Sequence, residues 1–225
     1  MPCCEDSNMK HPMERRRLSA RLLALCTLAV MPALARSASE AGESRPARLI
    51  VEQVCAACHG NTGQSTQKAY PSLAGQNEDY LFKQLRQFKA GASEPALRQD
   101  ATMAAVVQSM SETQMREVAR YFSRQAPARG QAALPHLVGA GMAIYWKGNP
   151  SNHLPACVTC HRPNGEGIAP DFPRIAGQQP EYVARQLHAW KSGTRGGPGK
   201  LMSLLVPLMT DEEILAVAQY VAQLR

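Results

Sequence analysis

Two five-residue segments carry residue types that can do chemistry together: Cys55–His59 (Cys-Ala-Ala-Cys-His) and Cys157–His161 (Cys-Val-Thr-Cys-His). In each, two cysteines stand three positions apart, which places both thiols on one side of a helical turn. There they can form thioethers with the two vinyl groups of one haem, and the next histidine can bind the iron. The spacing therefore predicts two c-type haem sites. The residues assigned to attachment are Cys55, Cys58, Cys157 and Cys160, and those assigned to iron are His59 and His161.

Other sites built on a Cys-x-x-Cys pair fit the sequence less well. A zinc site with four cysteine ligands would need the two pairs to meet, and it would leave both adjacent histidines without a function. A thioredoxin-like dithiol lies in a βαβ unit, and no pattern typical of strands is present. A disulfide within so short a loop is strained. The other cysteines, Cys3, Cys4 and Cys26, all precede residue 36, so the two motifs hold every later thiol.

The first 35 residues have the pattern of a secretory signal. A basic stretch around Arg15–Arg17 is followed by the apolar stretch Leu22–Met31, and Ala33–Ala35 has the small residues of a cleavage site. The apolar stretch is too short to span a bilayer. The sequence therefore predicts a signal peptide over residues 1–35 and a mature protein in the periplasm.

The charge balance argues against a nucleic-acid partner. The whole chain holds 25 Lys and Arg against 18 Asp and Glu, a net charge of +7. Part of that charge belongs to the signal, because residues 36–225 hold 20 basic and 15 acidic residues. Two haems would add up to about four propionate charges of opposite sign, which leaves the mature protein close to neutral.

The rest of the chain is an internal duplication. At an offset of 102 residues, Tyr70–Gln76 matches Phe172–Gln178. In the same register Tyr80, Gln84, Leu85, Lys89 and Gly91 match Tyr182, Gln186, Leu187, Lys191 and Gly193. The duplication predicts two units: a first repeat over residues 36–125, a short linker over 126–134 and a second repeat over 135–225. Each repeat alone would bury a thin core, and a central haem would supply the missing apolar volume.

Helical signals dominate both repeats and predict an all-α fold. Pro46 favours a helix start ahead of the first haem motif, and residues 77–90 show one apolar face, with Gly91 as a C-cap. The capping box Ser111–Gln114 predicts a third helix. The second repeat predicts helices over residues 140–146 and 180–192 and a last helix opened by Thr210–Glu213.

Two pairs of methionines compete for the iron position opposite the histidine. Met110 and Met209 immediately precede the predicted N-caps, where a hydrophobic staple accounts for them. Met103 and Met202 lie in segments expected to be loops and have no such packing role. We therefore expect Met103 and Met202 to bind the two irons, with packing on the haem edge as the alternative.

Three further histidines, His136, His153 and His188, are expected at the surface. None of them has a histidine at the equivalent place in the other repeat. Ligation of either iron by two histidines is therefore disfavoured.

On these residues the chain resembles the class I cytochromes c, and in detail the dihaem cytochrome c4 family. The details are the aromatic-Pro-x-aliphatic-Ala-Gly-Gln segment of both repeats, the Lys-x-Gly helix end, and Gly148-Asn149 with Leu154–Cys157 ahead of the second site. The resemblance covers residues 46–225. It implies two tandem class I cytochrome c domains, each binding one haem through Cys, Cys, His and Met.

The resemblance also implies a role for two carbonyl groups. Those of Pro71 and Pro173 are expected to accept the Nδ1–H of the axial histidines, which fixes the tautomer and raises ligand basicity. The chain departs from the family pattern two residues after each expected methionine ligand, where Ala105 and Leu204 replace a frequent proline. The stiffness of the chain around each methionine is therefore in question.

The resemblance implies an electron carrier and not an enzyme, because two filled axial positions leave no open site for a substrate. Its partners would be redox proteins: a quinol-oxidising complex or dehydrogenase as donor and a terminal oxidase as acceptor. Peripheral association with a membrane is left open. The alternative function is the cytochrome subunit of a periplasmic dehydrogenase that oxidises sulfide, thiosulfate or an alcohol. A dihaem enzyme such as a peroxidase would need a displaceable ligand, and the matched methionines argue against it.

Overall fold

The computed structural model describes residues 45–89, 97–197 and 200–225. The predicted signal peptide, the start of the first repeat and the Gly91 C-cap lie outside these residues. The described parts of both repeats belong to one compact unit.

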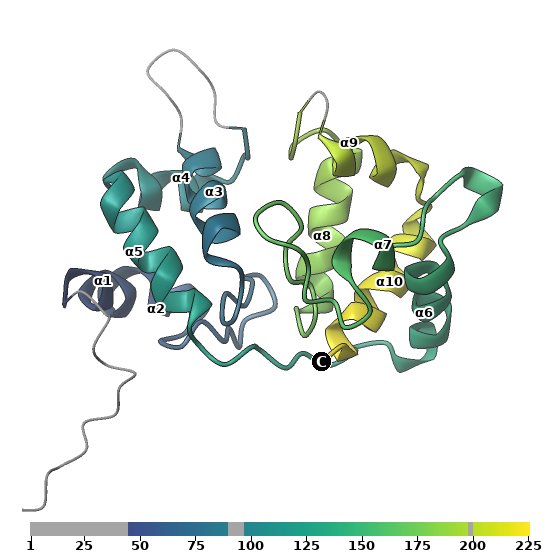
Figure 1. The fold of residues 1–225 in the computed structure, drawn as a ribbon, viewed down its shortest axis with the longest axis horizontal. Helices are drawn as coiled ribbons and strands as arrows, with labels where there is room; N and C mark the ends of the chain where they lie inside the picture. The colour runs from purple at the N-terminus through teal and green to yellow at the C-terminus, as the bar shows by residue number, and fades with distance from the viewer. Residues whose placement is uncertain (1–44, 90–96, 198–199) are drawn as a thin grey trace, which may run out of the picture. The chain divides into compact units, whose positions relative to one another are not determined.

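The described residues are helical, and among them the only β structure consists of isolated bridges. The first repeat holds α1 (Arg45–Ile50), η1 (Val51–Cys55), α2 (Ala56–His59), α3 (Glu78–Phe88), α4 (Ala101–Gln108) and α5 (Glu112–Ser123). The second repeat holds η2 (Pro135–Leu137), α6 (Val138–Lys147), η3 (Pro150–Asn152), α7 (Val158–His161), α8 (Pro180–Lys191), α9 (Leu201–Leu205), η4 (Val206–Leu208) and α10 (Asp211–Gln223) (Figure 1). The predicted all-α fold is confirmed. No helix in the described ranges is both long enough and apolar enough to cross a membrane.

Both predicted capping boxes are present, and they open the last helix of each repeat. The Ser111 hydroxyl accepts the Gln114 N–H at 3.2 Å, and the Gln114 side chain accepts the Ser111 N–H at 2.9 Å. Thr210 and Glu213 form the same two bonds, at 3.2 and 2.9 Å. Each box satisfies N–H groups that a helix start leaves without partners, so α5 and α10 begin where the sequence predicts.

Each repeat has an apolar core of its own. In the first repeat α3 packs on α5, and Phe122 and Met115 are buried between the elements. In the second repeat α10 packs on α6 and α8 around Tyr145 and Ile214, which are fully buried. The amphipathic pattern of the longer helices thus predicts their buried faces correctly.

The helix that leads to the first haem motif changes its hydrogen-bonding pattern on the way. It starts as α1, as Pro46 predicts, and continues through Val51–Cys55 as a π-helical turn before α2. Val51 is fully buried there. Single π-helical turns inside helices are frequent at functional sites, because they reorient the side chains that follow.

The segments that carry Met103 and Met202 are helical, whereas their sequence predicts loops. Met103 lies in α4, whose N-cap Asp100 accepts the Met103 N–H at 3.0 Å. Met202 lies in α9, a helix of five residues that continues into the 3₁₀ turn η4. Helices this short carry little periodic signal and depend on packing, which here comes from contacts of α4 with α3 and of α9 with α8.

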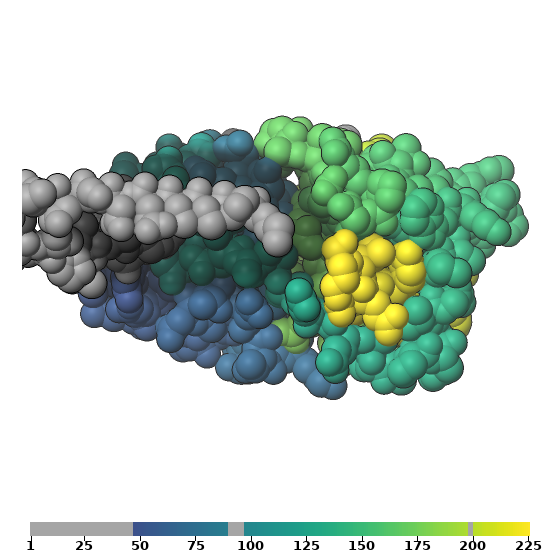
Figure 2. Space-filling model, turned by 60° about the horizontal axis from the view of Figure 1, so that its bottom comes forward, coloured from purple at the N-terminus to yellow at the C-terminus, as the bar shows by residue number. Residues whose placement is uncertain are grey.

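Residues 126–134 contain no helix or strand. Within this stretch the Gly130 carbonyl accepts a hydrogen bond from Arg225 Nη2 at 3.2 Å. A Cβ on Gly130 would lie 2.7 Å from the carbonyl oxygen of Gly177, so glycine is required for this close approach. The C-terminal residues that meet the linker are exposed on the face shown in Figure 2.

Candidate haem sites

The two histidines of the motifs are held in the same way. His59 ends α2 and His161 ends α7, and their side chains are only 7% and 8% exposed. Nδ1 of His59 lies 2.9 Å from the Pro71 carbonyl oxygen, and Nδ1 of His161 lies 3.0 Å from that of Pro173. Because a carbonyl oxygen can only accept, each Nδ1 carries the proton and each Nε2 keeps its lone pair for a metal. The carbonyl contacts implied by the family resemblance are therefore present.

The environment of both imidazoles favours the neutral form. Burial lowers the pKa of His59 and of His161, and the hydrogen bond to the proline carbonyl opposes this only in part. The aromatic residue directly before each of these prolines packs edge-on against the imidazole, Tyr70 at 6.2 Å and Phe172 at 6.5 Å between ring centres. A neutral imidazole with fixed orientation is the form that ligates iron.

The four cysteines of the motifs are free thiols, and each is partly buried. Burial, with a smaller contribution from Cys58, raises the pKa of Cys55 to about 11. Burial likewise raises the pKa of Cys157 to about 11. Among the described residues no three His, Cys, Asp or Glu side chains gather around a common point, so the two pairs do not build a Cys4 zinc site. Each cysteine pair instead stays within its own repeat, at the spacing that thioether formation with one haem requires.

The two methionine pairs differ in burial, as the capping argument predicts. Met110 and Met209 are 6% and 5% exposed and belong to the apolar cores. Met103 and Met202 are only partly buried, and they pack on the edges of the same cores as Cys55 and Cys157, respectively. Each repeat thus brings its attachment cysteine and its partly exposed methionine to one core. Two thiols for attachment to the vinyl groups, with an imidazole nitrogen and a methionine sulfur for the iron, fit haem c.

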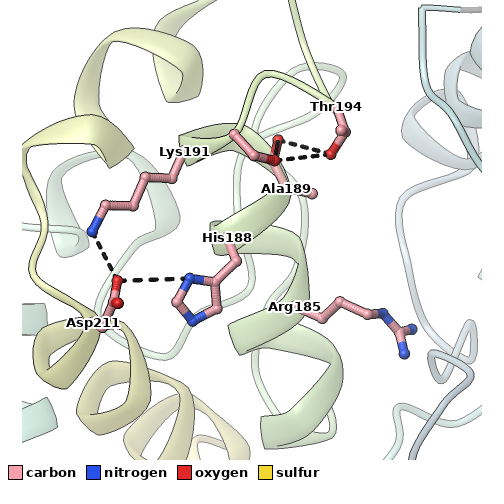
Figure 3. Close-up of a pocket in the computed structure, with 7 residues that line it drawn as sticks. Arg185, His188, Ala189, Lys191, Thr194 and Asp211 are labelled. Carbon is pink, nitrogen blue, oxygen red and sulfur yellow. Dashed lines mark hydrogen bonds and ion pairs between the residues drawn. The ribbon is translucent and has the colours of Figure 1, made fainter.

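Three other histidines lie within the described residues, and none of them belongs to the buried cores on which Met103 and Met202 pack. His136 and His153 are exposed. His188 lies on α8 in a surface hollow, with Nδ1 3.8 Å from a carboxylate oxygen of Asp211, to which Lys191 also donates at 2.8 Å (Figure 3). The expectation that these histidines lie at the surface is confirmed for His136 and His153, and His188 is half-exposed.

Sequence reasoning missed a cluster that joins the two repeats around two buried arginines. Arg98 donates to the side chains of Gln84, Tyr182 and Gln186, and Arg195 donates to those of Gln186, Tyr80 and Gln84. Arg98 stacks on Phe88 and Arg195 on Trp190. The duplication does align the tyrosines and glutamines, but the two arginines are 97 positions apart. A fixed offset therefore does not pair them.

The cytochrome c family model matches this chain twice, at residues 45–125 and 140–225. Cytochrome c4 of Azotobacter vinelandii is 39% identical over 175 residues, which cover 75% of this chain and 83% of the relative. The thiosulfate dehydrogenase electron acceptor of Thiomonas intermedia is 38% identical over 172 residues, covering 75% and 77%. The crystal structure of reduced recombinant cytochrome c4 from Pseudomonas stutzeri superposes with a TM-score of 0.75 at 33% identity, covering 82% of this chain and all of that one.

Proposed function

We propose, from the premise that the chain belongs to the cytochrome c4 family of dihaem electron carriers, a specific ligand set for each of its two haems. As a member of that family the chain binds two covalently attached haem c groups and carries electrons. The thioethers form on Cys55 and Cys58 in the first repeat and on Cys157 and Cys160 in the second. The axial ligands are His59 with Met103 and His161 with Met202.

One observation supports this proposal more than any other. In both repeats the histidine that follows the cysteine pair is buried and donates its Nδ1–H to a proline carbonyl twelve residues further on. A metal-binding histidine needs its second nitrogen held in this way. Because the arrangement occurs twice, at duplicated positions, coincidence is a poor explanation.

The chain would contribute to electron transfer by holding each iron with one imidazole nitrogen and one methionine sulfur. When bound, haem c supplies the one-electron couple of its iron. A methionine sulfur paired with an imidazole as ligands would raise the reduction potential and would leave no coordination position for a substrate. We therefore propose a carrier without an enzymatic activity of its own.

The ligand set is tested by four single substitutions in the holoprotein. Met103→Ala and Met202→Ala should each remove the near-infrared sulfur-to-iron charge-transfer band of one haem and lower the potential of that haem. The matched controls are Met110→Ala and Met209→Ala, which should keep both bands and cost about 2–5 kcal/mol of stability through core truncation. Loss of a band in the control variants would assign the ligands to the staple methionines instead.

The leader pattern supports export to the periplasm, and we propose cleavage after Ala35, so that residues 36–125 and 135–225 form the two domains around the linker 126–134. Fractionation of cells and N-terminal sequencing of the holoprotein test this. A mature chain that still contains the apolar stretch Leu22–Met31 would mean a retained anchor, and with it a membrane-attached carrier.

For the donor we propose a quinol-oxidising complex or a periplasmic dehydrogenase, with a terminal oxidase as acceptor. The thiosulfate dehydrogenase electron acceptors among the relatives favour a thiosulfate-oxidising donor as the second candidate. The test is to mix oxidised holoprotein with quinol plus membranes, or with thiosulfate plus a periplasmic extract, and follow haem reduction. Reduction only in the second mixture, with co-purification of a dehydrogenase, would establish the second candidate.

A further inference from the structure

The peptide group that orients each axial histidine is held by the other repeat. The Ser72 N–H donates to Oε1 of Gln178 at 2.9 Å, and Nε2 of Gln178 donates to the Ser72 carbonyl at 2.8 Å. The mirror pair is also present. The Arg174 N–H donates to Oε1 of Gln76 at 2.9 Å, and Nε2 of Gln76 donates to the Arg174 carbonyl at 2.7 Å.

The place of these contacts in the chain gives them chemical meaning. The Ser72 N–H and the Pro71 carbonyl belong to one peptide group, and that carbonyl accepts the Nδ1–H of His59. The Arg174 N–H and the Pro173 carbonyl are related in the same way to His161. Resonance couples the two ends of a peptide group, so a hydrogen bond given by its N–H makes its carbonyl a stronger acceptor.

A further hydrogen bond holds the side-chain amide of each glutamine in one orientation. Oε1 of Gln76 also accepts the Asn77 N–H at 2.9 Å, and Oε1 of Gln178 also accepts the Gln179 N–H at 3.0 Å. These bonds set which end of each amide faces the other repeat. Each glutamine therefore presents an acceptor to the N–H and a donor to the carbonyl of the same residue.

We infer that Gln178 is a positioning residue for the haem of the first repeat, and Gln76 for the haem of the second. The inference rests on the proposed ligation by His59 and His161. A stronger acceptor at Nδ1 makes the imidazole a more electron-rich ligand, which favours oxidised iron and lowers the potential. Each repeat thus adjusts the potential of the other through one neutral side chain.

The test is a crossed redox titration of the holoprotein, with each haem followed by the NMR signals of its own axial ligands. Gln178→Leu should raise the potential of the first-repeat haem more than that of the second. Gln76→Leu should give the opposite pattern. The His59 Nδ1–H resonance of the reduced protein should move in Gln178→Leu, because its hydrogen bond weakens.

Two kinds of control separate this effect from a loosened interface. Tyr182→Phe and Tyr80→Phe each remove a hydrogen bond that a buried arginine donates across the repeats, without touching the proline peptide groups. They should leave both potentials close to those of the parent protein. Gln178→Glu keeps the acceptor for the Ser72 N–H and adds negative charge, so it should lower the first-repeat potential, opposite in sign to Gln178→Leu.

Equal shifts of both haems in Gln178→Leu, or the same shifts in Tyr182→Phe, would overturn the inference. If Gln178→Leu does not fold, the sign of the shift in Gln178→Glu decides: a rise, or a change confined to the second repeat, would overturn it as well. Failure of this inference leaves both charge-transfer bands in place. If the proposed ligation is wrong, the charge-transfer bands persist in Met103→Ala and Met202→Ala. The two failures are therefore distinguishable.

Discussion

The two repeats use different residues for the turn that follows the histidine of the haem motif. In the first repeat Gly60 follows His59 with a φ of 77°, and a Cβ there would lie 2.7 Å from the Gln64 carbonyl oxygen. In the second repeat Arg162 takes the same place with a φ of 65°. Both turns combine this positive φ with an extended ψ of 154° and 162°, a region nearly confined to glycine, where a residue with a Cβ costs about 1–3 kcal/mol. Equivalent sites can therefore be built with or without local strain.

The strained turn of the second repeat has contacts that offset its cost. The fully buried Tyr145 donates its hydroxyl to the Arg162 carbonyl, and the Arg162 guanidinium pairs with Glu166 at 3.1 Å. Both side chains of that ion pair are about half-exposed, so solvent screens the pair and leaves it a weak contribution. The buried hydroxyl is the larger contributor. The residue after the histidine therefore has to adopt a positive φ, and it does not have to be glycine.

The largest expected difference between the repeats follows from removing the haem of one of them. Cys55→Ala with Cys58→Ala should leave one haem per chain, and so should Cys157→Ala with Cys160→Ala, because each repeat has its own core. A pyridine haemochrome assay against protein concentration gives the ratio. Loss of both haems from either variant would show that the repeats do not mature independently.

Alanine at the residue after each histidine should cost the two repeats different amounts of stability. Gly60→Ala should cost about 1–3 kcal/mol, because it adds strain and a contact with backbone that cannot move away. Arg162→Ala should cost clearly less than Gly60→Ala, because the strain is already present and only an exposed ion pair is lost. Denaturant unfolding of the two holoproteins measures both. Equal costs would mean that Arg162 is not strained in the folded protein.

The helices of the expected methionine ligands differ in capping and give a smaller effect. Asp100→Ala should cost about 0.5–2 kcal/mol, because Asp100 is an N-cap whose side chain accepts the Met103 N–H. Lys200 holds the N-cap position of α9 without a side-chain bond, so Lys200→Ala should be near neutral. Thermal unfolding provides the values, and a comparable loss in both variants would refute the difference in capping.

The smallest effect concerns two acids at duplicated positions, Asp79 and Glu181. Asp79 pairs with Arg116 of its own repeat at 2.6 Å, whereas Glu181 pairs with Lys68 of the other repeat at 3.0 Å. Burial would raise the pKa of Glu181, but the hydrogen bond and charge of Lys68 outweigh it and hold that pKa below its ordinary value.

Because the folded pKa of Glu181 is lowered, its contribution is present above the unfolded pKa and is lost as pH falls through the folded value. Glu181→Gln should therefore cost under about 1 kcal/mol at neutral pH and nothing in strong acid. Unfolding curves at both pH values check this, with Asp79→Asn as the matched variant. A cost of Glu181→Gln that persists in acid would assign the effect to packing.

Much of the fold and of the candidate sites could be predicted from local pattern. The capping boxes at Ser111 and Thr210 depend on residues three positions apart, and they also separate the staple methionines from Met103. The helices that carry Met103 and Met202 could not be predicted, because packing on α3 and α8 stabilises them and sequence periodicity does not.

The contacts of Gln76 and Gln178 could not be predicted for another reason. The duplication aligns the two glutamines, but a partner about 100 positions away is set by how two folded repeats meet. The same holds for Arg98 and Arg195, whose partners lie in both repeats. Alignment within a chain therefore finds equivalent residues and does not reveal which residues they contact.

The glutamine contacts have a consequence for how the protein responds to ionic strength. At 0.1 M salt, dissolved ions screen exposed charges from one another with a screening length of about 10 Å. Hydrogen bonds between neutral groups are largely unaffected. Added salt should weaken the exposed Lys68–Glu181 pair between the repeats, and it should leave the neutral glutamine contacts beside the two haem sites largely in place. The electrostatic attraction between the protein and a charged redox partner is weakened by the same ions. Salt concentration therefore separates the two electron-transfer steps experimentally, because it slows exchange with a charged partner and spares exchange within the chain.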